Sequence, residues 1–336
     1  MRGERFRSWV VFAFLICLVA IMAACSKPAQ VGKHYTVAVI PMGSTHEYWK
    51  SFHAGAVKAV QDLAGQGTKV DIIWKAPLRE QDREEQTRIV EGFISQRVDG
   101  IVLAPSDGHA LVRPVEEAAS AGIPTVVVDS ALDTTKIVSF VASDNYQGGV
   151  LAADQIGELL NGKGKVVLLR YQEGVASTHD REEGFVQKIK SYPEIELVSS
   201  NQFSGPTRET SRRASENLLT RYAGQIQAVF TPNEASTAGM LLALQDIKRA
   251  GNLVLIGFDM SETFITAMRN NQLQGIVVQN PFRMGDLGVK AMIDHLEARN
   301  VKARVDTGVM LVTPGNMETP EAQQLLHPPL QEYLNQ

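Results

Sequence analysis

Polar and aromatic side chains gather where the apolar runs of this sequence end. Successive run ends carry Met42, Ser44, His46, Tyr48 and Trp49, then Trp74 and Lys75, Asp129 and Ser130, Arg170, Asn233 and Glu234, Phe258 and Asp259, and Gln279 and Asn280, and a further loop carries Ser177, Thr178, His179 and Arg181. A sugar has apolar C–H faces that aromatic rings can cover, and its hydroxyls both donate and accept hydrogen bonds. These residue types therefore favour a site for a sugar or polyol.

Several of these residues also have a plainer interpretation. Trp49 stands at a helical position and suits a protein core. Asp129, Asn233 and Asp259 are of turn or helix-cap types, and His179 taken alone fits a structural or exposed position better than a ligand contact. The residue types alone leave both interpretations open.

Motifs of catalysis and cofactor binding are missing from the sequence. It has no phosphate loop ending in Gly-Lys-Ser/Thr, no Gly-x-Gly-x-x-Gly after the first apolar run and no Gly-x-Ser-x-Gly elbow. The seven histidines are scattered, without the spacing of a metal site. We therefore expect no catalytic residue, no cofactor and no metal, and a secreted enzyme acting on a sugar is only a remote alternative. A formal net charge of -4 without a basic block argues against nucleic acid as a partner.

The first residues are typical of an export signal. Arg2, Arg5 and Arg7 precede an uncharged apolar run at 9–22, and small residues then precede Cys25. This pattern is similar to a bacterial lipoprotein signal at 1–24, after which Cys25 would be lipidated. The alternative is an ordinary signal peptide with an incidental cysteine. Cys17 would leave with the signal, so the mature fold would contain no disulfide.

Strand-like and helix-like segments alternate along the rest of the chain. Strands are predicted at 35–41, 70–74, 100–104, 125–129, 137–142, 165–169, 196–202, 228–231, 253–258, 274–279 and 309–312, and helices at 48–63, 82–96, 111–121, 181–191, 207–222, 234–250, 261–270 and 286–299. Another helix is predicted after the cap types Ser143, Asp144 and Asn145. The pattern predicts an α/β fold of two doubly wound, parallel-sheet lobes, because so many strands exceed one such sheet.

The chain resembles the periplasmic sugar-binding proteins of ABC importers, of the ribose-binding type. The resemblance is carried by segments 37–55, 121–129, 142–149, 181–185, 228–234 and 256–259 and by Gln279. It implies two lobes joined by a three-strand hinge, with the ligand cleft between them. It places the N-terminal lobe at 35–143 plus 280–308, the C-terminal lobe at 144–279 plus 309–325, a tether at 25–34 and a tail at 326–336.

The resemblance also implies roles for single residues. Tyr48 and Trp49 match two aromatics that stack on the sugar ring, His46 matches a polar contact, and Phe258 matches a pocket wall. The hydroxyl-binding groups match Asp129, Asn233, Asp259 and Gln279. Ser130 and His179 stand where ribose binders have arginines, whereas Arg181 matches an arginine that we interpret as structural. Ribose itself is therefore doubtful, and Trp74, Lys75 or Arg170 are further candidate contacts.

The resulting functional prediction is a lipid-anchored solute-binding protein that delivers a sugar or sugar-like polyol to the membrane subunits of an ABC importer. We expect a monomer that is exported to the bacterial cell envelope and held on a membrane through Cys25, in the periplasm or on an outer face. The alternative is a ligand-binding sensory receptor that partners a membrane kinase or chemoreceptor. The two alternatives share every site residue.

Overall fold

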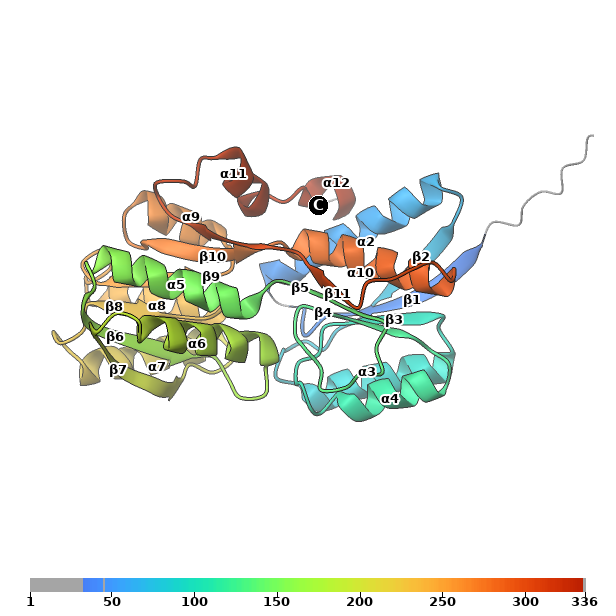
Figure 1. The fold of residues 1–336 in the computed structure, drawn as a ribbon, viewed down its shortest axis with the longest axis horizontal. Coiled ribbons are helices and arrows are strands. Elements are labelled where there is room, and N and C mark those ends of the chain that lie inside the picture. Colours follow the sequence, from blue (N-terminus) through green and yellow to red (C-terminus); the bar gives the residue numbers. More distant parts are fainter. Residues whose placement is uncertain (1–32, 45, 335–336) are drawn as a thin grey trace, which may run out of the picture.

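Two lobes of similar construction make up the protein. The computed structural model describes residues 33–44 and 46–334. The predicted signal at 1–24, Cys25 and most of the predicted tether lie outside these residues. Figure 1 shows the two lobes side by side, each built on a six-stranded sheet with helices on both faces. This confirms the predicted fold class.

The N-terminal lobe is built on a wholly parallel sheet. Its strand order is β11-β5-β4-β3-β1-β2. The strands are β1 (His34–Ile40), β2 (Lys69–Trp74), β3 (Gly100–Leu103), β4 (Thr125–Val128), β5 (Ser139–Ala142) and β11 (Arg304–Asp306). Helices α2 (Glu47–Gly65) and α10 (Pro281–Leu296) cover one face, and α3 (Arg83–Gln96) and α4 (Val112–Ser120) cover the other. Because both faces are covered, the inner strands β3 and β4 are buried throughout.

The C-terminal lobe repeats this plan with the strand order β12-β10-β9-β8-β6-β7. Its strands are β6 (Lys163–Arg170), β7 (Glu194–Phe203), β8 (Ala228–Phe230), β9 (Val254–Phe258), β10 (Gly275–Gln279) and the antiparallel edge strand β12 (Val309–Val312). Helices α5 (Asn145–Leu159) and α6 (Ala176–Ile189) pack on one face. The other face carries α7 (Arg208–Arg221), α8 (Glu234–Asp246), α9 (Glu262–Arg269) and α11 (Pro320–Leu326).

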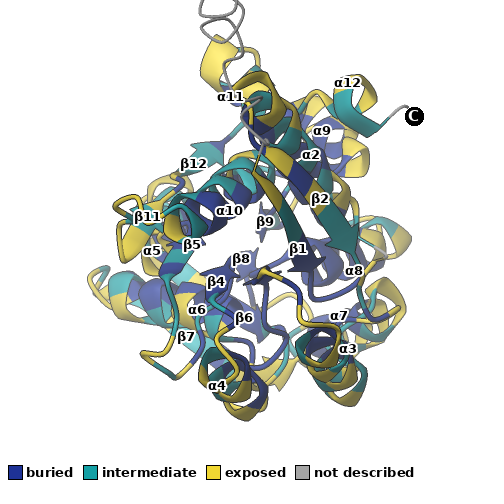
Figure 2. Ribbon diagram, turned by 90° about the vertical axis from the view of Figure 1, so that its right-hand side faces the viewer, coloured by how far each residue is buried: buried dark blue, intermediate teal, exposed yellow. Residues whose placement is uncertain are grey.

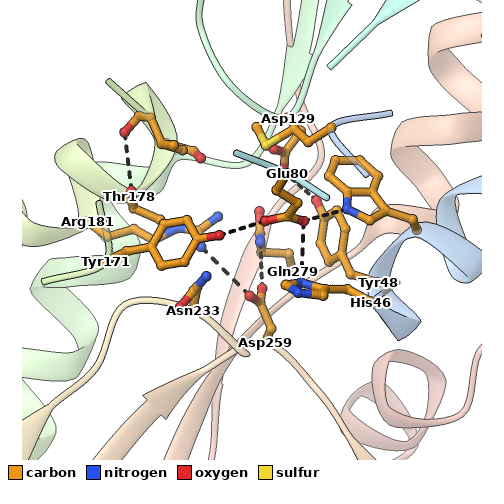
Figure 3. A pocket seen from close by; sticks show the side chains of 14 residues that line it. His46, Tyr48, Glu80, Asp129, Tyr171, Thr178, Arg181, Asn233, Asp259 and Gln279 are labelled. Atoms are coloured by element: carbon orange, nitrogen blue, oxygen red, sulfur yellow. Dashed lines mark hydrogen bonds and ion pairs between the residues drawn. The ribbon is translucent and has the colours of Figure 1, made fainter. Parts of the chain in front are cut away.

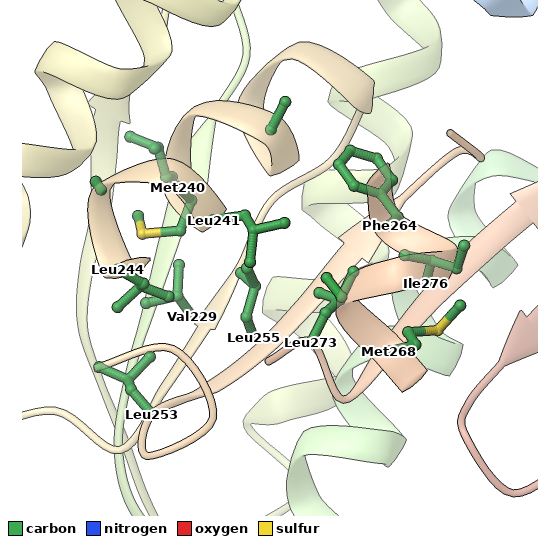
Figure 4. Packing of buried hydrophobic residues seen from close by; sticks show 14 of the residues in the cluster. Val229, Met240, Leu241, Leu244, Leu253, Leu255, Phe264, Met268, Leu273 and Ile276 are labelled. Atoms are coloured by element: carbon green, nitrogen blue, oxygen red, sulfur yellow. The ribbon is translucent and has the colours of Figure 1, made fainter. Parts of the chain in front are cut away.

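The cores lie between the sheets and their helices. Figure 2 shows the central strands of both lobes as buried and the outer helix faces as exposed. In the C-terminal lobe, Leu241, Leu255, Phe264 and Ile276 are among the side chains that fill the space between the sheet and its helices (Figure 4). These apolar layers hold the strand ends in place, and the strand ends carry the polar residues of interest.

The described chain passes between the two sheets at three points. These lie between β5 and α5, between β10 and α10, and between β11 and β12. Ser143 ties two of the crossings together, because its hydroxyl donates to the carbonyl oxygen of Gly308 at 2.7 Å. After β12 the chain forms α11 and then α12 (Leu330–Leu334), which packs on α2 of the N-terminal lobe.

Some elements differ from the sequence prediction. Helix α6 begins at Ala176 and not near 181, and α10 begins at Pro281, behind the cap Asn280, and not at 286. The short edge strand β11 and the last two helices were not predicted. The predicted caps Asp144 and Asn233 do begin helices, since their side chains accept from the backbone N–H groups of Gln147 and Ser236. No helix in the described part of the chain is long and apolar enough to cross a membrane.

Candidate functional site

A small cavity of about 40 Å³ lies between the lobes, at the carboxyl ends of strands from both sheets. Met42, His46, Tyr48, Trp49, Glu80 and Asp129 line it from the N-terminal lobe. In the C-terminal lobe, the connection after β6 and the start of α6 contribute Tyr171, Val175, Ser177, Thr178 and Arg181. Strand ends contribute Asn233, Asp259 and Gln279. Figure 3 shows these side chains converging from both lobes. In parallel sheets, ligands bind at such strand ends.

Asp129 follows β4 directly and is almost fully buried. Its backbone is left-handed, with a φ of 63°, and its N–H donates to the carbonyl oxygen of Val141. The Tyr48 hydroxyl donates to Asp129 Oδ1 at 2.5 Å. Burial raises the pKa of the Asp129 carboxyl to about 6, and burial beside this carboxylate raises the pKa of Tyr48 well above its usual value.

Asp259 occupies the corresponding place after β9 in the other lobe. Its φ is 66°, and its N–H donates to the carbonyl oxygen of Val277 on the neighbouring strand. Gln279 Nε2 donates to Asp259 Oδ1 at 2.7 Å, and the backbone N–H of Glu234 donates to Oδ2 at 3.1 Å. Burial raises the pKa of Asp259 despite these donors. Each lobe therefore presents one buried carboxyl from a left-handed residue at a strand end.

Arg181 brings a guanidinium to the cavity from α6. Its Nε donates to Asn145 Oδ1 and its Nη1 to the carbonyl oxygen of Pro232, each at 2.9 Å. The guanidinium lies 3.9 Å from the centre of the Phe258 ring, and its Nη1 lies 3.9 Å from Asp259 Oδ2. These contacts hold the guanidinium at the cavity wall, where its positive charge partly balances the negative charge of Asp259.

Glu80 enters the cavity from the connection between β2 and α3. Its Oε1 accepts from the Trp49 indole at 2.7 Å and lies 3.3 Å from His46 Nδ1. Its Oε2 accepts from the Tyr171 hydroxyl at 2.8 Å. Because Tyr171 follows β6, this last bond joins the two lobes across the cavity (Figure 3).

Backbone groups join the lobes as well. Gly108 N–H donates to the carbonyl oxygen of Gly174 at 3.0 Å, and Arg83 Nη2 donates to that of Glu173 at 2.8 Å. The N–H of Ser177 donates to the Ser130 hydroxyl at 3.1 Å. The structure therefore has the lobes closed on each other around the cavity.

Most of the predicted contact residues come together at this cavity. His46, Tyr48, Trp49, Asp129, Asn233, Asp259 and Gln279 all line it. Two of them also fit their plainer interpretation, because Trp49 is packed in the core cluster of its lobe and Asn233 caps α8. A residue can therefore pack in the core, as Trp49 does, or cap a helix, as Asn233 does, and still line the cavity.

Other predicted contacts lie elsewhere. Phe258 is buried beneath Arg181, and the Ser130 hydroxyl is engaged by Ser177. His179 and Arg170 line a separate cavity of about 370 Å³, and Arg170 pairs there with the buried Glu182. Trp74 stacks on His53, and Lys75 is exposed outside the site.

Several lining residues were not assigned by the sequence analysis. Arg181 was interpreted as structural, but its side chain lines the cavity, so Arg181 and not residue 179 supplies the guanidinium. Tyr171 lies two residues after the predicted strand at 165–169, and this position was a usable signal. Glu80 lies in a connection six residues after Trp74, and nothing in its local sequence indicates that it turns inward.

The arrangement suits the binding of a small polar ligand. Carboxylates, two amides and hydroxyls surround the cavity beside aromatic rings, of which Tyr48 and Trp49 meet edge to face at 4.9 Å. Such groups satisfy the donors and cover the C–H faces of a small polar ligand. Within residues 33–44 and 46–334, no group of three or more His, Cys, Asp or Glu side chains is placed to hold a metal ion.

Several known proteins are similar to this chain in sequence and fold. The ribose import binding protein of Bacillus subtilis (strain 168) is 29% identical, with 90% of this chain and 98% of the relative covered. A carbohydrate transporter solute binding protein from Agrobacterium radiobacter, solved with D-arabinose, has a TM-score of 0.82 at 31% identity, covering 88% of this chain and 99% of that protein. An ABC transporter solute binding protein from Agrobacterium vitis with bound D-fucose also gives 0.82 at 31% identity, covering 87% and 100%.

A family model supports the same assignment. The model described as the periplasmic binding protein domain matches residues 37–300, which include both sheets except their edge strands β11 and β12 and part of β1. The two lobes, their closure and the site between them agree with this match. The chain therefore belongs to the periplasmic binding protein domain family.

Proposed function

We propose that this protein is the exported receptor of an ABC importer and captures a sugar or sugar-like polyol between its lobes. The observation that carries the proposal is the pair Asp129 and Asp259, which face one cavity from equivalent places in two different lobes. A ligand that bonds to both carboxyls holds the lobes together. The proposal covers binding without turnover, and it keeps the lobe limits at 35–143 plus 280–308 and 144–279 plus 309–325.

The relatives support a carbohydrate as the ligand class. They are described as binding ribose, D-arabinose and D-fucose. These sugars differ in ring substituents but share several adjacent hydroxyls, which suit the acceptors of this cavity. We propose that ribose is not the preferred ligand here. Position 130 carries a serine where ribose binders have an arginine, and Glu80 places an additional carboxylate in the site.

A binding screen tests this proposal. Thermal shift with a panel of pentoses, hexoses, polyols, sugar acids and amino sugars should identify ligands, because a ligand that binds only the folded state raises the melting temperature. Calorimetry on the best ligand should then show a loss of about one to two powers of ten in affinity for Asp129→Asn or Asp259→Asn. Asp154→Asn on α5, where the carboxylate pairs with Lys188 of the same lobe and does not line the cavity, is the control. No binding from the whole panel, or unchanged affinity in both site variants, contradicts the proposal.

We further propose that Cys25 carries the lipid that holds the receptor at the membrane. Stable attachment needs more than one acyl chain, so the expected product is a multiply acylated cysteine. Cys25→Ala should abolish partitioning into detergent, with Cys17→Ala as the matched control inside the predicted signal. Partitioning that persists in Cys25→Ala would exclude this anchor and leave the binding proposal untouched.

A further inference from the structure

The cavity carries more negative than positive charge. Glu80, Asp129 and Asp259 contribute three carboxylates and Arg181 one guanidinium, which gives a formal charge of -2 with His46 neutral. All four charged side chains belong to residues that are less than one-tenth exposed. Water therefore stabilises these charges poorly, and partners must do so.

Arg181 is the one guanidinium among the described residues that line the cavity, and its charge acts on both aspartates. Arg181 lies beside Asp259, whereas the hydrogen-bond donors to Asp129 and Glu80 are the neutral groups of Tyr48, Trp49 and Tyr171. The nearby buried Glu234 does not change this balance, because Arg208 pairs with it. One guanidinium therefore balances the two aspartates only in part, and the Glu80 carboxylate, whose hydrogen-bond donors are neutral, adds to the negative charge on the N-terminal side.

The cavity also has acceptors without donors. Gln279 is 2% exposed, and its Oε1 has no hydrogen-bond partner among the described residues, since Gln279 donates to Asp259 through Nε2. Oε2 of Glu234, next to the site, has no hydrogen-bond partner in the described part of the chain but lies 3.9 Å from His46 Nδ1. Buried acceptors are normally satisfied, so Oε1 of Gln279, which lines the cavity, favours a ligand that brings a donor.

We propose that the ligand carries a protonated amine, and that its class is an amino sugar or amino polyol whose ammonium lies near Asp129 and Glu80. This rests on the proposed function and specifies the substrate of the same site. An ammonium has three donors and no acceptor, which matches both the charge and the acceptor excess. Tyr48 and Trp49 line the same side of the cavity, and aromatic rings attract a cation that lies over their faces.

Two other ways of balancing the charge fit less well. A metal ion would need converging ligands, and the described residues contain no such group of three. Protonation of Asp129 relieves the charge only in part, because a pKa that burial raises to about 6 still leaves this carboxyl mostly ionised at neutral pH. A cationic ligand balances the charge without added protons.

Calorimetry with matched pairs of ligands tests the inference. Each pair consists of an amino sugar and the sugar with a hydroxyl in place of the amine, for example D-glucosamine with D-glucose and D-galactosamine with D-galactose. The N-acetylated form of each amine is a third arm, because it keeps the nitrogen and removes the charge. In the best-binding pair we expect the amine to bind at least tenfold more tightly than the hydroxyl form, and the N-acetyl form to lose this advantage.

A charge variant separates the amine from the rest of the ligand. Glu80→Gln keeps the shape of the side chain and removes its charge, so it should reduce affinity for the amine about tenfold and affinity for the neutral partner much less. Glu194→Gln, at an exposed position on β7, should leave both affinities unchanged. Equal losses for amine and neutral ligand in Glu80→Gln would contradict a charge-specific contact.

The outcomes also separate this inference from the proposed function. Tight binding of a neutral sugar, with every amine equal or weaker, overturns the inference and leaves the sugar-receptor proposal in place. No binding of any carbohydrate, neutral or cationic, overturns both. Selective binding of an amine that depends on Glu80 supports both.

Discussion

The two cavity carboxyls are held by backbone that few residues adopt. Asp129 and Asp259 have φ values of 63° and 66°, in the left-handed region where aspartate and asparagine are more common than bulkier residues. Their N–H groups are fixed by the strands of Val141 and Val277. Each turn thus directs a carboxyl into the cavity instead of continuing the strand, and such backbone is typical of functional sites.

Asp129→Asn should stabilise the ligand-free protein. The folded-state pKa of about 6 lies above the usual aspartate value of 3.8, so folding favours the protonated carboxyl. The stability that this carboxyl contributes is complete below pH 3.8 and is lost as the pH rises through 6. At about 1.4 kcal/mol per unit, the loss at neutral pH reaches about 3 kcal/mol, and asparagine, which also tolerates the left-handed backbone, avoids it.

Urea unfolding of both proteins without ligand measures this effect. We expect Asp129→Asn to be more stable than the wild type by about 1–3 kcal/mol at neutral pH, with the difference roughly halved one unit below the pKa. The difference between the two proteins reports on the Asp129 carboxyl alone, because the groups that face it are the same in both. These groups are Tyr48, Glu80, Arg181 and Asp259. A variant that is less stable than the wild type at neutral pH would mean that Asp129 is not a strained, buried charge.

At the scale of elements, the helix pair α5 and α6 positions Arg181. A Cβ at Gly149 of α5 would lie 1.9 Å from the backbone oxygen of Arg181, and one at Gly184 of α6 would lie 2.1 Å from that of Tyr146. The two helices therefore touch through backbone. The N-terminal lobe has the same device in α2 and α10, where a Cβ at Gly55 would meet the carbonyl oxygen of Phe282.

Gly149→Ala should separate the two helices and displace Arg181. Overpacking of this kind typically destabilises by about 1–3 kcal/mol, and affinity for the ligand should fall as well. Gly92→Ala on α3 is the control, because its Cβ meets nothing within 4 Å and alanine favours a helix by about 1 kcal/mol. Denaturation and calorimetry on both variants check this. Wild-type stability in Gly149→Ala would show that the close contact is not required.

The elements were largely predictable from sequence, and the site was predictable in part. Buried parallel strands are continuous apolar runs, so those such as β4 were found with their following aspartates. The start of α6 was missed because residues 176–180 lack the apolar spacing of the rest of the helix. Glu80 was missed for a different reason: its inward direction depends on Trp49 and Tyr171, which lie far from it in the sequence.

At the scale of the whole molecule, several polar contacts join the two lobes, and the Tyr171–Glu80 hydrogen bond is the one that crosses the cavity. Tyr171→Phe removes the hydroxyl that joins the lobes to Glu80 and leaves a buried carboxylate oxygen without its donor. A loss of about 1–3 kcal/mol is typical for such a change, which corresponds to roughly 5- to 150-fold weaker ligand binding. Tyr192→Phe removes a similar bond, to Asp154 within one lobe, and should leave affinity unchanged. Equal effects of both variants in calorimetry would argue against a closing contact.

Closure around a ligand is the central claim, and small-angle X-ray scattering tests it most directly. A ligand shifts the lobes toward the closed state only through contacts that the open state lacks, such as simultaneous bonds to Asp129 and Asp259. We predict that the best ligand of the screen reduces the radius of gyration of the wild-type protein at saturation, and reduces it less in Asp259→Asn at the same concentration. A radius that stays the same with and without saturating ligand would contradict a ligand held between two closing lobes.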